Sequence, residues 1–113
     1  MTARERLPDR RPCESFEIEA AGLRYVATIA RYPDGRLGEI FLAGRKAGSA
    51  ADNVARDAAI TASIALQFGA DVETIRRALC RDALGRARGP LGVVLDLLVE
   101  DKMTCRPTTP VFR

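Results

Sequence analysis

One stretch of the sequence constrains the fold more than any other. Across residues 58–66 every residue is apolar or carries a small hydroxyl, so a helix over this stretch has no polar stripe to face water. A helix that is apolar on all sides is normally buried on several of them. Ser49 is a suitable N-cap, Asp52 lies where the helix dipole favours a carboxylate, and Gly69 suits the left-handed position after the last turn. The pattern predicts a long buried helix over about residues 49–68.

The residues before this helix alternate with the period of two that is typical of strands with one buried face. Apolar Phe16 and Ile18 alternate with glutamates, and a similar alternation follows Gly22. The Tyr-Pro-Asp-Gly sequence at residues 32–35 favours a tight turn, because proline presets φ and glycine accepts a positive φ. We therefore expect a three-stranded antiparallel meander over about residues 15–43.

Two shorter helices are expected after the central one. Asp71 is a suitable N-cap for a helix over about residues 72–82, whose buried side includes Ile75. Pro90 suits the first position of a last helix over about residues 90–100, where leucines and valines recur at spacings of three and four. Three strands followed by three helices make the expected fold class α+β, with the sheet packed against the long buried helix.

The chain is expected to form one domain with loose ends. A length of 113 residues fits one modest domain. Residues 1–13 are polar, rich in arginine and interrupted by prolines, so we expect a flexible basic arm there. We place the single domain at residues 14–100 and a loose tail at residues 101–113, which have no apolar periodicity.

The composition excludes several classes of function. The chain has no histidine, the commonest general base and metal ligand, and its three cysteines, Cys13, Cys80 and Cys105, are far apart. An odd and scattered set of cysteines is typical neither of a disulfide framework nor of a zinc site. No apolar stretch is long enough to cross a membrane, and the N-terminus lacks the apolar core of a secretion signal. We expect a cytoplasmic protein with no cofactor, no metal and no membrane partner.

The loops around the predicted third strand carry a candidate anion-binding site. Two glycines, an arginine and a lysine precede the N-terminus of the central helix, and such residues together with free helix amides can hold a phosphate-like anion. The order and spacing of a Walker loop are missing. Alternatively, these residues only shape turns, pair with a neighbour or cap the helix. The predicted site comprises Asp34, Arg36, Glu39, Arg45, Lys46 and Ser49.

The residues alone also allow two other functions besides anion binding. A small enzyme would use Glu39 or Asp82 as an acid or base near Lys46 or Arg81, but such charge pairs are common on surfaces, so we predict no catalytic residue. A nucleic-acid-binding module would use the arginine-rich N-terminal segment and the arginines of residues 76–88. Few aromatic residues alternate with these arginines, which argues against stacking on single-stranded bases.

Four motifs follow one another along the chain. They are Tyr32-Pro33-Asp34-Gly35, Gly38-Glu39-Ile40-Phe41, Lys46 with Gly48-Ser49, and Ala65-Leu66-Gln67-Phe68-Gly69. This series resembles the TSCPD domain, which stands at the C-terminal end of adenosylcobalamin-dependent (class II) ribonucleotide reductases. The resemblance covers roughly residues 14–99. A later run, from Arg81 to Asp96, is similar to short free-standing bacterial relatives of that domain.

The resemblance implies a link to deoxyribonucleotide metabolism. Such a reductase generates a thiyl radical inside a large barrel and reduces ribose with a cysteine pair, and this machinery does not fit in the present chain. The cysteine-rich element that gives the domain its name is not recognisable either, because Cys105 stands alone in that region. We therefore expect a non-catalytic accessory or regulatory module that binds a nucleotide-like anion or a protein partner such as a reductase. The alternative that the resemblance implies is a component of a ribonucleotide-reductase-type oxidoreductase.

Association with a second copy is also expected. Three short strands and three helices have difficulty covering a helix that is apolar on all sides, and a meander leaves an edge strand open. A homodimer through the central helix or through the sheet edge would cover both surfaces.

Overall fold

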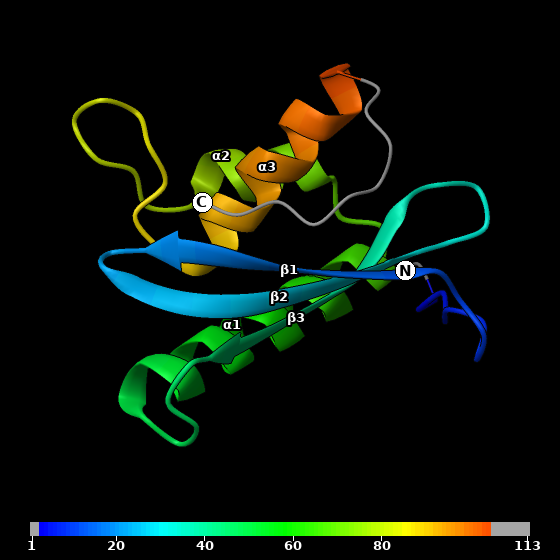
Figure 1. The fold of residues 1–113 in the computed structure, drawn as a ribbon. Coiled ribbons are helices and arrows are strands. Elements are labelled where there is room, and N and C mark those ends of the chain that lie inside the picture. The colour runs from blue at the N-terminus through cyan, green and yellow to red at the C-terminus, as the bar shows by residue number, and fades with distance from the viewer. Residues whose placement is uncertain (1–2, 105–113) are drawn as a thin grey trace.

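The computed structural model describes residues 3–104, with side chains as far as residue 100 (Figure 1). Its elements are β1 (Cys13–Ala20), β2 (Leu23–Arg31), β3 (Leu37–Gly44), α1 (Ala50–Gln67), α2 (Val72–Ala78) and α3 (Pro90–Thr104). The strands form an antiparallel sheet in the order β1-β2-β3, so the predicted α+β fold and its meander are confirmed. Helix α1 packs mainly against β3, and α3 packs against β1.

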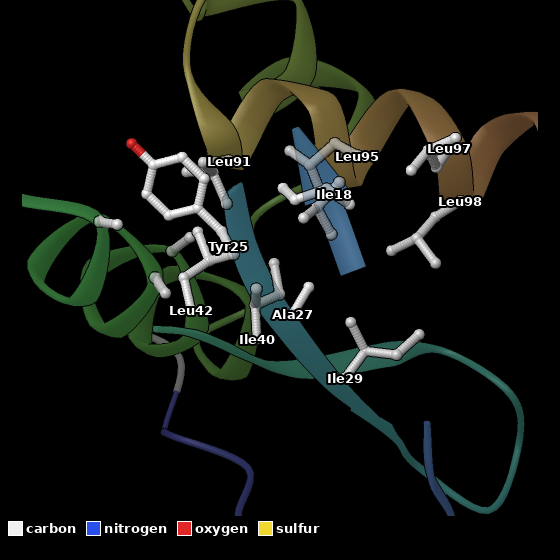
Figure 2. Packing of buried hydrophobic residues seen from close by; sticks show 14 of the residues in the cluster. Ile18, Tyr25, Ala27, Ile29, Ile40, Leu42, Leu91, Leu95, Leu97 and Leu98 are labelled. Carbon is white, nitrogen blue, oxygen red and sulfur yellow. The ribbon is translucent and has the colours of Figure 1, made fainter. Parts of the chain in front are cut away.

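The apolar residues predicted for the strands share one face of the sheet. Phe16 lies opposite Ala27, and Ile29 lies opposite Ile40, and residues that face each other in antiparallel strands point to the same side. All four side chains are buried in one core with the inner residues of α1 and α3. Figure 2 shows the leucines of α3, including Leu95, closing this core. The other face of the sheet is open to solvent.

The hairpin between β1 and β2 turns through Ala21 and Gly22, which both have positive φ values of 52° and 79°. Two consecutive positive φ values belong to a type I′ turn, where Asn-Gly is preferred and alanine is strained by about 1 kcal/mol or more. We expect Ala21→Asn to raise the melting temperature by a few degrees. Ala47→Asn, in an exposed loop without positive φ, is the control and should change little. A melting temperature that falls in Ala21→Asn would contradict the turn geometry.

Helix α1 covers the outer edge of β3 with polar side chains. The Ser63 hydroxyl accepts a hydrogen bond from the amide of Ile40 at 2.8 Å and lies 2.9 Å from its carbonyl oxygen. Gln67 Nε2 donates to the carbonyl oxygen of Gly38 at 2.9 Å. These backbone groups point away from β2 and would otherwise be unpaired at a strand edge. Helix α1 therefore pairs this edge of the sheet at Gly38 and Ile40.

Helix α2 is shorter than the sequence pattern predicts. The predicted end at about residue 82 is wrong, because the helix ends at Ala78. The Asp82 carboxylate accepts hydrogen bonds from the amides of Leu84 and Arg86, both at 2.9 Å, and so closes a tight turn that competes with the helix. The loop between α2 and α3, drawn in yellow in Figure 1, projects from the body of the domain. Leu84 in this loop is 76% exposed.

Helix α3 is longer than predicted. Its inner residues Val94, Leu95 and Leu98 are buried, as their spacing predicts. The helix continues to Thr104, past the predicted end at about residue 100. The predicted loose tail therefore begins inside a helix, and residues 105–113 lie outside the described part of the chain.

The residues before β1 contact the body of the domain. The amide of Glu5 donates to the carbonyl oxygen of Gln67 at 2.7 Å, and Arg11 forms an ion pair with Glu39 at 2.9 Å. These contacts tie the segment to the end of α1 and to β3. The flexibility that the sequence predicts for residues 1–13 stays a prediction, which hydrogen exchange at these amides would measure.

Candidate protein-docking site

An apolar groove with a volume of about 520 Å³ lies between α1, α2 and α3. Small side chains form its floor, so another backbone can approach α1 closely. Larger side chains from the end of α2 and the start of α3 form its walls. The residues that define it are Ala58, Thr61 and Ala65 on the floor, with Ile75, Leu79 and Leu91 in the walls.

The solvent side of α1 is apolar along most of the helix. Val54 is 69% exposed, Ile60 51% and Phe68 43%, and Ile64 is exposed beside them. The prediction that this helix is buried on several sides is wrong for the single chain, because the sheet and α3 cover only one side of it. Large exposed apolar patches are typical of surfaces where proteins associate. The groove and this face together form one continuous candidate docking surface.

One of the described side chains that line the groove, Asp57, carries a charge. Its carboxylate is exposed and has no hydrogen bond or ion pair with the described part of the chain. A partner that covers the groove would take water away from this carboxylate, which is unfavourable unless a cation replaces the water. Asp57 is not among the residues predicted from sequence for a site, although its charge stands out between Val54 and Ile60 on the same helix.

The six residues predicted for an anion site are spread along β3 and the loops at its two ends. Asp34 and Arg36 lie in the turn before the strand, where Arg36 Nε donates to the Asp34 carboxylate at 2.7 Å. Arg36 also pairs with Glu5 at 2.9 Å. Arg45 and Lys46 follow the other end of the strand, roughly 24 Å away at the rise of an extended chain. The structure does not bring the two groups together.

Asp52 occupies the loop amides that an anion at the start of α1 would need. Its carboxylate accepts hydrogen bonds from the amides of Gly44 at 2.6 Å and Gly48 at 2.9 Å, and from Arg56 Nε at 3.0 Å. The Gly48 and Gly44 amides, with Arg56, hold the pKa of Asp52 below its usual range. Ser49 caps the helix by accepting the Asp52 amide, as predicted. At the start of α1 the Asp52 carboxylate therefore takes the place that a bound anion would occupy.

The remaining predicted site residues lie apart from one another. Glu39, inside β3, is paired with Arg11. The side chains of Arg45 and Lys46 are exposed and have no ion pair with residues 3–100. The Arg45 amide donates to the carbonyl oxygen of Arg24 at 3.2 Å, which places a third exposed cation beside them.

Most arginines of the predicted basic segment are neutralised within the domain. Asp96 of α3 accepts Arg76 Nη1 at 3.0 Å and Arg81 Nη2 at 2.9 Å. Arg86 pairs with Asp82 at 3.2 Å in the loop. These ion pairs join α2, the loop and α3, and they offset part of the positive charge that would contact a nucleic-acid backbone. They also engage Asp82 and Arg81, the pair considered for acid–base chemistry.

No cluster of three or more His, Cys, Asp or Glu side chains that could hold a metal ion occurs among the described residues. Within residues 3–104 no helix is both long and apolar enough to cross a bilayer.

Comparison with known proteins gives one consistent result. The chain is 38% identical over 72 residues to a vitamin B12-dependent ribonucleotide reductase of Rhodopirellula baltica and 36% identical over 73 residues to that of Bradyrhizobium diazoefficiens. A protein of the same name from Streptantibioticus cattleyicolor is 37% identical over 71 residues. This chain is homologous to one segment of these reductases. The similarity covers 63–65% of the chain but only 6–12% of the reductases.

Because the homology covers only a small part of each reductase, few properties of the reductases can be assigned to this chain. The chain spans about a tenth or less of most of these reductases, so their whole-protein activity does not follow from it. No protein-family model matches the chain. No solved structure matches it either. The assignment of this chain as a reductase-related segment therefore rests on its sequence homology and on its own α+β fold.

Proposed function

We propose that this chain is a non-catalytic accessory or regulatory module of deoxyribonucleotide metabolism, which binds a protein partner through the groove beside α1. The observation that carries the proposal is the exposed apolar side of α1 on a segment homologous to part of a much larger enzyme. In the reductases the matching segment has the rest of a long chain available to cover such a face. The resemblance to the TSCPD domain supports the same assignment, and we expect the protein to act in the cytoplasm.

A vitamin B12-dependent reductase is the first partner to test. We expect sedimentation velocity of the full chain with the reductase of Bradyrhizobium diazoefficiens to show a complex at micromolar concentration. We expect the chain alone, given a ribonucleotide, adenosylcobalamin and a dithiol, to form no deoxyribonucleotide. Product formed by the chain alone would contradict a non-catalytic role. Sedimentation of the two proteins as separate species would contradict the reductase as partner.

A nucleotide-like anion is the second candidate ligand. The observation that favours it is the group of exposed cations formed by Arg24, Arg45 and Lys46, which have no ion pair with residues 3–100. Because Asp52 occupies the loop amides, side chains alone would hold this anion, so its binding should weaken steeply with added salt.

We expect Lys46→Ala to abolish the thermal shift produced by a nucleotide at low salt without changing the melting temperature of the free protein. At about 100 times its dissociation constant a ligand adds roughly 2.7 kcal/mol of stability, which a screen of ribonucleotides, deoxyribonucleotides and adenosylcobalamin would detect. Arg31→Ala, at the far end of β2, is the control. An equal shift in Lys46→Ala and in the unchanged protein would remove Lys46 from the site.

A further inference from the structure

The lining of the groove determines what kind of segment fits it. Helices supply its floor and walls, and the backbone amides and carbonyls of a helix are already paired within it. An extended segment placed here would bury its own backbone polar groups without partners, which is unfavourable in an apolar site. A helix satisfies its backbone internally and presents only side chains. The groove therefore suits a helix and not a strand.

The dimensions of the groove set the length of that helix. The α1 residues that line the groove extend from Val54 to Ala65, which corresponds to roughly 17 Å at the rise of an α-helix. Small side chains at Ala58, Thr61 and Ala65 allow the axes of two helices to approach to about 8–10 Å. About three turns of a helix with one apolar face fill this length, as in other helix-in-groove complexes.

The charge in the groove identifies one further property of the occupant. Asp57 lies at the border of the apolar floor and has no partner in the described chain. A wholly apolar helix would desolvate this carboxylate without compensation. A lysine or arginine on the bound helix would pair with it and fix the direction in which the helix lies.

In the symmetric arrangement that best matches the two apolar faces, the α1 helix of a second copy does not supply that cation. Two α1 helices packed antiparallel around Thr61 would match Val54 with the second copy's Phe68, which suits their apolar faces. The same arrangement places Asp57 opposite the second copy's Ala65, so two carboxylates are covered and neither is paired. The charge in the groove thus favours a different protein over a homodimer through the central helix.

We propose that the groove beside α1 binds an amphipathic helix of another protein, about three turns long, which carries a lysine or arginine facing Asp57. This inference rests on the proposed function as a docking module and adds the chemistry of the partner segment. It assigns Asp57 as the residue that selects among apolar helices.

Synthetic peptides test the inference without knowledge of the natural partner. The probes are helical peptides of about 14 residues with leucines on one face. In one set a lysine is placed at each successive position bordering the leucine face, and in a matched set glutamate replaces that lysine. Binding is measured by fluorescence anisotropy with the full chain, with Asp57→Lys and with Glu19→Lys. Glu19 is exposed on β1, outside the groove, so its variant makes the same change of charge elsewhere.

The unchanged chain should bind the best lysine peptide about tenfold more tightly than its glutamate counterpart. Asp57→Lys should reverse this preference, and Glu19→Lys should keep it. Absence of binding by every peptide, or the same preference in Asp57→Lys, would overturn the inference. A stable dimer that Thr61→Arg converts to a monomer would also overturn it, because a second copy would then occupy the groove. Peptide binding without reductase binding would keep the inference and reject only the reductase as partner.

Discussion

Replacing Asp52 with alanine should lower the melting temperature by about 10 °C or more. The Asp52 side chain is only 2% exposed, and it accepts the amides of Gly44 and Gly48 together with Arg56 Nε. Without the carboxylate, the part-buried loop amides lose their acceptor and Arg56 loses its ion pair. The connection between β3 and α1 would then lose its buried polar anchor and keep only the contacts of Ser49.

Asp57→Ala is the matched control, because it removes the same carboxylate from an exposed position on the same helix. We expect its melting temperature to stay within a few degrees of the unchanged protein. Thermal unfolding followed by circular dichroism compares the two variants. Equal melting temperatures for Asp52→Ala and Asp57→Ala would show that the loop anchor contributes nothing to stability.

The Asp52 anchor also predicts how stability depends on pH. The amides of Gly48 and Gly44 and the Arg56 guanidinium lower the pKa of Asp52 in the folded chain. A carboxyl group with a lowered folded pKa stabilises fully above its unfolded pKa of about 4, and this contribution is lost as the pH falls through the folded value. Below pH 4 the difference in stability between the unchanged chain and Asp52→Asn should therefore shrink. A constant difference across this range would contradict the assignment.

Leu95→Ala should destabilise the domain by about 2–5 kcal/mol. Leu95 is 1% exposed and belongs to the core that α3 shares with the sheet. Truncating it removes buried methyl groups and leaves a cavity that a closely packed core fills only in part. Urea unfolding should show a lower midpoint with a similar slope.

Leu84→Ala makes the same chemical change in the projecting loop. Leu84 is 76% exposed, so the free energy of unfolding of the Leu84→Ala variant should differ from that of the unchanged chain by no more than about 0.5 kcal/mol. A large loss in Leu84→Ala would indicate that the loop covers apolar surface. A negligible loss in Leu95→Ala would contradict the packing of α3 on the sheet.

The sheet could be predicted from sequence because its signals are local. Period-two alternation around Phe16 and Ile18, together with the turn chemistry of Pro33 and Gly35, determines which face is buried and where the chain reverses. The cap at Ser49 is local as well, and the structure confirms it. Each of these elements depends on residues no more than a few positions apart.

Other features of the fold depend on contacts between distant residues. The end of α2 is set by a turn around Asp82 that competes with the helix, and helical spacing alone does not reveal that competition. Ser63 appears in sequence as a small neutral residue in an apolar helix, yet it pairs with the backbone of Ile40 across the domain. The arm contacts of Glu5 and Arg11 are likewise long-range.

The candidate docking site was predictable only in part. The run of small and apolar residues in α1 indicated a helix that needs a partner surface, and association was expected from it. Sequence periodicity alone does not show which side of this helix the sheet covers, so it could not single out Val54, Ile60 and Phe68 as exposed. The importance of Asp57 appears only when Ile75 and Leu79 are placed beside it to form a groove.

The most direct test of the docking site compares two Val→Glu variants. Val54→Glu places a charge on the exposed face of α1, and Val26→Glu places the same charge on the open face of the sheet, where Val26 is also exposed. Their dissociation constants for the Bradyrhizobium diazoefficiens reductase can be measured by isothermal titration calorimetry. We predict that Val54→Glu weakens binding by tenfold or more and that Val26→Glu binds like the unchanged chain. Equal affinity of Val54→Glu and the unchanged chain, or a loss confined to Val26→Glu, would contradict the docking site on α1.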